Sequence, residues 1–174
     1  MLRVEIGGGT RDRGDGWVNV DQIDSADIVH DLNSLPWPFD DESVDELYSS
    51  HCIEHVESDR DFIREVARIC RVGARVEIRA PDAMSEMANI YGHKTVFSIN
   101  VVRHADHVFP ELFWSNCDRR LKLDRIEYGA DDYWFAKARS NRVFAHYSDE
   151  DILDWVPRTK HENRFHFTVV PKTT

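Results

Sequence analysis

The hydrophobic residues of the first eighty positions fall into short, β-branched runs that are separated by polar turns. Continuous apolar runs of this kind are typical of parallel strands that are covered on both faces. They predict five strands, at about Leu2–Ile6, Trp17–Asp21, Ile28–Asp31, Val44–Ser49 and Ala74–Ala80. We therefore expect an α/β protein in which a mostly parallel sheet lies between two layers of helices.

The clearest helical period lies between the last two of these runs, from about Asp59 to Cys70. Its apolar residues share one face and its charges lie opposite, while Gly73 is placed to end the helix. The apolar face consists of Phe62, Ile63, Val66, Ile69 and Cys70. A strand, a helix and a second strand in this order predict a right-handed βαβ unit, since the connection is far longer than a hairpin turn.

The second half of the chain is less regular. The segment Met84–Arg120 is rich in aromatic residues and histidines, and we expect a helix or two over the ligand-binding edge of the sheet. Leu121–Tyr128 and Phe165–Val170 resemble strands, the latter an edge strand, with a short helix near Glu150–Trp155 between them. A length of 174 residues suits one core, so we expect a single domain over residues 1–174.

Composition and charge narrow the class of protein. The hydrophobic content of 41% is that of a globular protein. The start of the chain lacks a secretory signal, and no apolar run approaches the roughly 18 residues of a membrane span, so we expect a cytoplasmic protein without membrane contact. The net charge of −10 does not favour nucleic acid as a partner, although Arg119, Arg120, Lys122 and Arg125 form a local basic cluster. Three dispersed cysteines indicate neither a disulfide framework nor a metal site.

Candidate chemistry begins with three glycines, Gly7, Gly8 and Gly9, which directly follow the first predicted strand. Open α/β sheets bind their ligands at this position, and glycine lets the backbone approach the ligand closely. Asp21 ends the second strand, where a carboxylate can accept hydrogen bonds from the hydroxyls of a ribose, and Asp31 ends the third. Together these residues at one edge of a sheet favour a nucleoside site.

The sequence also indicates which nucleoside fits. A pyrophosphate needs a G-x-G-x-x-G turn that opens a full helix, but position 12 is Asp. Only about seven residues, 10–16, separate the glycines from the second strand, too few for a crossover helix. NAD and FAD therefore fit poorly, whereas S-adenosylmethionine (SAM) carries no phosphate and needs this helix less.

Five segments in a fixed order resemble the class I SAM-dependent methyltransferases, in particular a compact, type 11-like subgroup with a Gly-Trp-x-Asn-Val-Asp segment. The segments are Val4–Gly9, Gly16–Asp21, Asp27–Leu32, Leu35–Phe39 and Ser50–His55. The resemblance covers roughly residues 2–82. It implies SAM as cofactor and a Rossmann-like three-layer sandwich, whose mostly parallel seven-stranded sheet has an antiparallel last strand. The first crossover helix of that fold would be vestigial here, and Gly8 stands where the family often has Cys, Ser or Ala.

The resemblance also implies roles for residues. It puts Gly7–Gly9 beside the methionine part of SAM, Asp21 on the ribose, and Asp31 with Leu32 near the adenine. Ser50 and His51 would line the site at the end of the fourth strand. Relatives of this compact type imply a small-molecule or saccharide acceptor.

His51 is the candidate catalytic base, because histidine titrates near neutral pH and this one lies where an acceptor should approach. Two alternatives remain open. Residues His51, Glu54 and His55 spell H-x-x-E-H, the motif of a zinc-dependent hydrolase, although a predicted strand runs directly into it. The short first crossover is also compatible with a non-catalytic nucleoside-binding module that has the methyltransferase fold.

Overall fold

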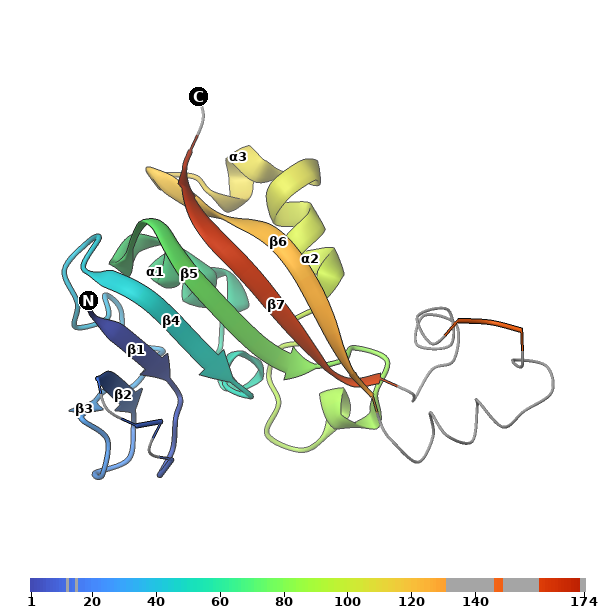
Figure 1. Cartoon of the computed structure of the whole chain (residues 1–174), viewed down its shortest axis with the longest axis horizontal. Helices are drawn as coiled ribbons and strands as arrows, with labels where there is room; N and C mark the ends of the chain where they lie inside the picture. The colour runs from blue at the N-terminus through green and yellow to red at the C-terminus, as the bar shows by residue number, and fades with distance from the viewer. Residues whose placement is uncertain (12, 15, 131–145, 149–159, 173–174) are drawn as a thin grey trace.

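The computed structural model describes residues 1–11, 13–14, 16–130, 146–148 and 160–172. Their strands form one seven-stranded sheet in the order β3-β2-β1-β4-β5-β7-β6 (Figure 1). The strands are β1 (Arg3–Ile6), β2 (Trp17–Asp21), β3 (Ile28–Val29), β4 (Val44–Ser50), β5 (Cys70–Pro81), β6 (Arg119–Ala130) and β7 (Lys160–Pro171). Strands β1 to β5 pair in parallel, whereas β7 is antiparallel to both neighbours. The expected Rossmann-like sheet with an antiparallel last strand is thus confirmed.

The helix predicted between β4 and β5 is α1 (Asp59–Ile69). The Ser58 side chain caps it by accepting a 3.1 Å hydrogen bond from the Asp61 N–H. The remaining helical segments are η1 (Ile53–His55), η2 (Glu86–Asn89), α2 (Ile99–Arg103), the π-helical turn η3 (His104–Val108) and α3 (Pro110–Phe113). None of the helices in the described part of the chain is long and apolar enough to span a membrane.

The two faces of the sheet differ in chemistry. On one face the side chains are apolar and buried, as in the paired row Val4, Leu47, Val76 and Phe167. Helices cover this face: Ile63 of α1, Val102 of α2 and Phe167 of β7 border one small apolar space. The adjacent paired row, one residue along each strand, is polar and charged. It consists of Arg3, Glu46, Arg75 and Thr168. Because side chains alternate along a strand, this row points to the opposite face.

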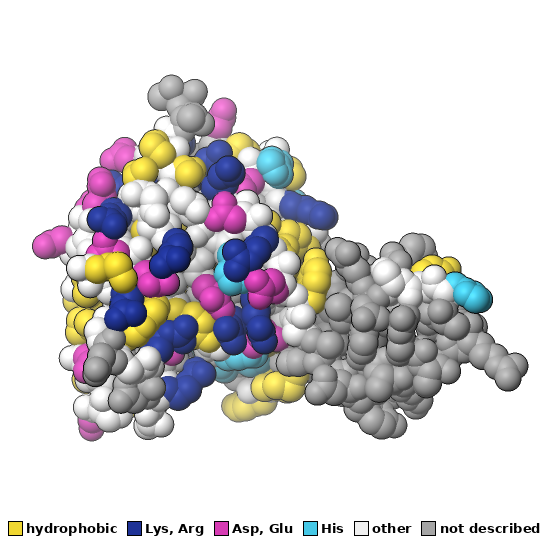
Figure 2. Space-filling model, in the orientation of Figure 1, with side chains coloured by type: hydrophobic (Ala, Val, Ile, Leu, Met, Phe, Trp, Pro, Cys, Tyr) yellow, Lys and Arg dark blue, Asp and Glu magenta, His cyan; other side chains and the backbone are white. Residues whose placement is uncertain are grey.

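The charged face of the sheet carries no α-helix among the described residues. Within the described residues the three α-helices lie behind the sheet in the view of Figure 1, and the charged face is turned toward the viewer. Figure 2 shows basic and acidic side chains interspersed over it. On β5 and β7 they include the ion pairs Arg79–Glu77 and Arg164–Glu162, both 2.7 Å. Arg75, Glu77 and Arg79 alternate with buried apolar residues along β5, which is the pattern of a strand with one charged face.

Three smaller expectations change. Helix α1 ends at Ile69 and β5 begins at Cys70, so Gly73 lies inside that strand, with φ +85°, and does not end the helix. Strand β7, predicted at the edge, lies between β5 and β6, and β6 is the edge strand. The helix predicted near Glu150–Trp155 falls outside the described residues.

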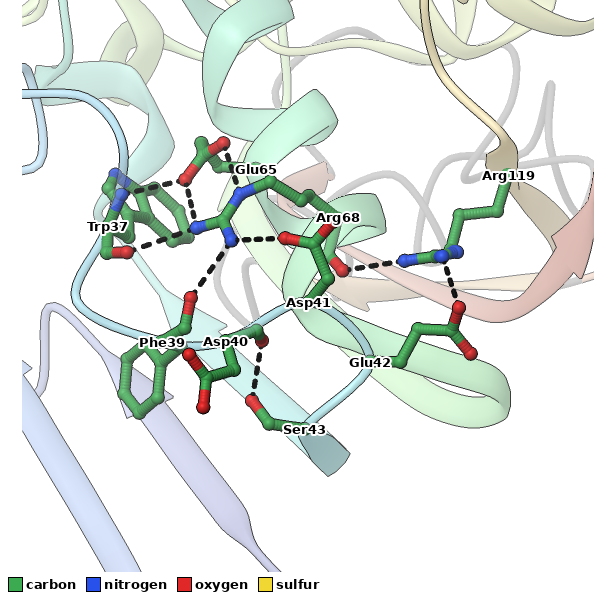
Figure 3. A network of polar contacts seen from close by, with 9 residues as sticks. All are labelled: Trp37, Phe39, Asp40, Asp41, Glu42, Ser43, Glu65, Arg68 and Arg119. Atoms are coloured by element: carbon green, nitrogen blue, oxygen red, sulfur yellow. Dashed lines mark hydrogen bonds and ion pairs between the residues drawn. The ribbon is translucent and has the colours of Figure 1, made fainter.

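A polar network holds the long connection between β3 and β4 against α1 (Figure 3). The Arg68 guanidinium donates to the carbonyl oxygens of Trp37 (3.0 Å) and Phe39 (2.9 Å). It also pairs with the carboxylates of Asp41 and Glu65, each at 2.7 Å. Glu65 in turn accepts a 2.7 Å hydrogen bond from the Trp37 N–H. One side chain of α1 thus fixes a loop where an open α/β fold often has a helix.

Arg119 of β6 ties the same connection to the far end of the sheet. Its guanidinium donates to the Arg68 carbonyl oxygen (2.8 Å) and pairs with the Glu42 carboxylate (Figure 3). The Trp37 indole, 2% exposed, packs edge-to-face on Phe62 of α1 with ring centroids 5.1 Å apart. Loop, helix and sheet edge are therefore joined through both polar and aromatic contacts.

Candidate cofactor site

A cleft of about 480 Å³ opens at the carboxyl ends of β1, β2 and β4. Its volume falls in the roughly 300–1,000 Å³ range of small-ligand sites. It brings together five of the residues predicted from the sequence: Gly7, Asp21, Asp31, Leu32 and His51. The other lining residues are Gln22, His30, Asn33, Cys52, His55, Val56, Gly92 and Lys94. Ligands of open α/β sheets bind at this edge of the sheet.

The glycine turn and the carboxylate that follows β2 contact each other directly. The Gly9 N–H donates a 2.8 Å hydrogen bond to Asp21 Oδ2. Asn19 holds the turn from the side, because its Oδ1 accepts from the Gly8 N–H (3.1 Å) and its Nδ2 donates to the Gly9 carbonyl oxygen (2.8 Å). The turn is thus pinned to β2 by two side chains and needs no helix to hold it.

Close packing explains two of the three glycines. Gly7 has φ +73°, and a Cβ there would clash with the Cys52 side chain. A Cβ at Gly8 would clash with the Asn19 amide. Of the three, Gly7 lines the cleft, whereas Gly9 borders a separate hollow on the other side of the turn. Gly8 and Gly9 therefore shape the turn from behind the cleft wall.

Asp31 has a structural role in addition to its position on the cleft. Its Oδ1 accepts hydrogen bonds from the backbone N–H and the side-chain Nδ2 of Asn33, both at 3.0 Å. The Asn33 Oδ1 accepts in turn from the Glu57 N–H at 2.9 Å. The Leu32 carbonyl oxygen accepts from the Trp37 indole at 3.1 Å. Asp31 and Leu32 are thereby fixed at the cleft wall.

His51 lies at the mouth of the cleft with both ring nitrogens at carboxylates. Its Nδ1 is 3.2 Å from Glu54 Oε1, and its Nε2 is 2.9 Å from Glu162 Oε2. The hydrogen bond to Glu54, aided by that to Glu162, raises the pKa of His51 despite partial burial. The Glu162 pKa is lowered, because its hydrogen bonds from Arg164 and His51 outweigh its burial. The two carboxylates thus favour the protonated form of the His51 imidazole.

Ser50 and Cys52 flank His51 and behave differently from it. Ser50 is buried, pairs with Arg79 across the sheet, and is not among the residues that line the cleft. Cys52 lies against Gly7, and burial raises the pKa of its thiol to about 12. The Cys52 thiol is therefore neutral and serves as an apolar part of the wall.

The H-x-x-E-H segment does not form the α-helix that a zinc-dependent hydrolase of this motif requires. His51 follows β4 with φ +52°, and only Ile53–His55 form a single 3₁₀ turn, η1. The His51 ring binds Glu54 rather than sharing a helix face with His55. The local backbone therefore does not support the alternative in which His51, Glu54 and His55 form the motif of a zinc-dependent hydrolase.

Sequence reasoning did not single out two residues that organise the site. Asn19, which clamps the glycine turn, is part of the Gly-Trp-x-Asn-Val-Asp segment, so its position in that motif was an available signal. Glu162 reaches His51 from 111 residues further along the chain. The antiparallel return of β7 beside β5 creates that contact, and no local pattern predicts it.

Comparisons with known proteins agree with this geometry. Residues 15–78 match the methyltransferase domain family. The chain is similar to a chain of the complex between the Haloferax volcanii Trm112 methyltransferase activator and a methyltransferase, with a TM-score of 0.63 and 19% identity over 96% of this chain and 81% of that one. It is also similar to a SAM-dependent methyltransferase from Archaeoglobus fulgidus, with a TM-score of 0.59 and 14% identity over 96% and 86% of the two chains.

A third similar structure is geranyl diphosphate C-methyltransferase from Streptomyces coelicolor, solved with Mg²⁺, geranyl diphosphate and S-adenosyl-L-homocysteine. The TM-score is 0.58 and the identity 16%, over 97% of this chain and 72% of that one. No curated protein matches the chain by sequence.

The fold and the cleft define an α/β protein that binds its ligand at the carboxyl edge of a Rossmann-like sheet. Residues 15–78 match the methyltransferase domain family, and the chain shares the fold of the similar SAM-dependent methyltransferase structures.

Proposed function

We propose that residues 1–174 act as one domain that binds SAM in the cleft and transfers its methyl group to a small-molecule or saccharide acceptor. In this proposal the turn Gly7–Gly9 holds the methionine part of SAM, with Gly7 at the ligand and Gly8 and Gly9 behind it; Asp21 binds the ribose, and Asp31 with Leu32 lies near the adenine. The observation that carries the proposal is the 2.8 Å hydrogen bond between the Gly9 N–H and Asp21. This hydrogen bond holds the glycine turn and a carboxylate together at one rim of the cleft. A nucleoside without a phosphate needs both, the turn for close backbone approach and the carboxylate for its ribose.

The charge of the cleft supports a cationic ligand. The carboxylates of Asp21 and Asp31 line it, and the buried Glu54 lies behind its mouth. The one lysine of the lining, Lys94, is directed to Glu57 at 2.5 Å. An excess of negative charge attracts the sulfonium of SAM and repels a phosphate. Asp21 Oδ2 receives the Gly9 N–H, which leaves Oδ1 for a ribose hydroxyl.

Methyl transfer from SAM is an in-line displacement. The bond between sulfur and the methyl carbon breaks as the acceptor atom forms its bond, and S-adenosylhomocysteine leaves as a neutral thioether. The protein contributes mainly alignment, which is worth up to about 7–11 kcal/mol for well-oriented reactants. We assign His51 to the positioning of Glu54 and Glu162, since both of its nitrogens contact carboxylates. This favours an acceptor that needs no base during the attack, such as the neutral amine of a small molecule or an amino sugar, which loses its proton to water after methylation.

The surface beside the cleft supports a compact acceptor with an apolar or ring face. Gly92 and Lys94 border the cleft, and the preceding Tyr91 is fully exposed. Exposed apolar side chains continue from there to Met84, Met87 and Ile90. An aromatic ring at such a rim can stack on a sugar or ring, whereas the cleft carboxylates oppose a polyanionic acceptor.

Calorimetric titration of the tag-free chain with SAM and S-adenosylhomocysteine tests the binding step. We expect both ligands to bind without added metal, and absence of binding would overturn the proposal. For the acceptor, the chain is incubated with methyl-tritiated SAM and a cell extract, and label is measured separately in small molecules, protein and nucleic acid. Label in the small-molecule fraction supports the proposed class. Label in macromolecules contradicts it, and binding without transfer would indicate a non-catalytic module.

A further inference from the structure

At the cleft mouth three side chains, to which the proposed SAM site assigns no direct ligand contact, converge on one point. Glu54, His55 and His93 each offer a ligand atom, and these atoms lie within 4.8 Å of one another. Two imidazoles and a carboxylate form a ligand set that suits Zn²⁺ and related divalent transition metals. The geometry points to a site for such an ion, and we propose that Glu54, His55 and His93 bind Zn²⁺.

A second observation is independent of this proximity. Glu54 is 2% exposed, and its Oε2 is buried without a hydrogen-bond partner among the described residues. The Nδ1 of His93 is likewise buried and unpartnered within the described part of the chain. A buried carboxylate oxygen that lacks a partner costs free energy, and a bound cation removes that cost. Two of the three candidate ligand residues thus carry a buried polar atom with which a bound cation can pair.

The surroundings of the three residues fit those of metal ligands. The His55 Nδ1 lies 3.2 Å from the Gly92 carbonyl oxygen, to which it can donate, and this leaves Nε2 with a free lone pair. Glu54 is oriented through its other oxygen, Oε1, by the His51 ring. Metal-binding residues are commonly held by outer contacts of these two kinds.

Backbone contacts bring His93 to the other two ligands across a distance in sequence. The N–H groups of Lys94 and Thr95 donate to the Glu54 carbonyl oxygen at 2.7 and 3.2 Å. The Thr95 hydroxyl donates to the Ile53 carbonyl oxygen at 2.8 Å. As a result the rings of His55 and His93 meet edge-to-face with centroids 4.7 Å apart. Zn²⁺ ligands at about 2.0–2.2 Å from the ion lie roughly 3.3 Å from one another, so binding requires the ligand atoms to approach by up to about 1.5 Å.

This set differs from the H-x-x-E-H reading, because His93 replaces His51 and no α-helix is involved. His55 is exposed and borders the cleft, so an ion with three protein ligands keeps an open position toward solvent there. Three protein ligands with one open position are typical of zinc sites that hold a water or substrate oxygen.

The test uses the full-length, tag-free chain after treatment with a chelator. Zn²⁺ affinity is measured by competition with a chromophoric chelator, and Co²⁺ serves as a spectroscopic probe of imidazole ligation. We expect one equivalent of Zn²⁺ to bind and to raise the melting temperature. Glu54→Gln and His93→Ala should each weaken binding at least about 100-fold, more than the loss of an outer-shell partner.

His30→Ala is the matched control, because His30 borders the same cleft outside the trio. It should leave the Zn²⁺ affinity unchanged. Circular dichroism confirms that each variant folds, and the isosteric Glu54→Gln variant keeps the test usable if an alanine variant does not. Zn²⁺ that binds equally to wild type and both ligand variants is an adventitious ion only and overturns the proposal. Failure to bind one equivalent also overturns it, whatever the chain does with SAM.

Discussion

The connection that follows β1 and the connection that follows β4 join parallel strands in different ways. After β4 the chain forms α1, whose apolar face packs under the sheet through Phe62 and Val66. After β1 it forms a short turn that two side chains of the next strand, Asn19 and Asp21, hold by hydrogen bonds. Both solutions bring the next strand alongside the previous one, but only the first covers a face of the sheet.

The comparison teaches that the ligand-binding edge and the second helical layer are separable. The cleft needs the glycine turn and the strand-end carboxylates, which polar contacts supply. Crossover helices would be needed to cover the opposite face of the sheet. In the described part of the chain, that face instead carries interspersed basic and acidic side chains (Figure 2). Stability should therefore depend mainly on α1 and its contacts, and cofactor affinity mainly on the polar turns.

The largest effect is expected under α1. Phe62→Ala removes a buried ring that packs on Trp37, so we expect a loss of about 3–5 kcal/mol in the free energy of unfolding. Chemical denaturation measures it, with the exposed Phe109→Ala as control. A loss below about 1 kcal/mol would mean that α1 does not carry the core.

A somewhat smaller effect is expected at the network of Figure 3. Arg68→Ala leaves Glu65 and two loop carbonyl groups without their donor, which should cost about 3 kcal/mol. Arg71→Ala is the control, since the Arg71 side chain is largely exposed in its ion pair with Asp45 and should contribute under about 1 kcal/mol. Equal effects of both variants in thermal denaturation would contradict the role assigned to Arg68.

A substitution at the carboxylate that holds the glycine turn should change the affinity for SAM more than the stability of the fold. In the proposed site Asp21→Asn would weaken a charge-assisted hydrogen bond to the ribose worth about 1.5–3 kcal/mol, so we expect SAM affinity to fall roughly 10- to 100-fold. Calorimetry measures it beside Asp24→Asn, which makes the same charge change just beyond β2. If the two variants bind SAM alike, Asp21 has no special part in the site.

The smallest effect is expected on the charged face of the sheet. Arg75 is largely exposed and lies 3.4 Å from Glu46, so Arg75→Ala should change the free energy of unfolding by under about 1 kcal/mol. Urea denaturation is sufficient to measure this. A loss above about 2 kcal/mol would show that this face is covered in the folded protein.

Local patterns predicted most of the strands and α1, because apolar period and turn chemistry are local properties. The same patterns predicted that Gly7, Asp21 and Asp31 lie at one edge of the sheet, because the carboxyl ends of parallel strands meet there, and all three line the cleft. What they missed depends on contacts that are distant in sequence. The carboxylate of Glu162 changes the expected chemistry of His51, and His93 reaches Glu54 through a backbone contact that no motif records.

The most direct test of the central claim is a crystal structure of the chain with S-adenosylhomocysteine. The account predicts the ligand in the cleft, with a ribose hydroxyl about 2.5–3.0 Å from the Asp21 carboxylate and the amino-acid part beside Gly7. A ligand bound elsewhere, or a ribose without contact to Asp21, would contradict it.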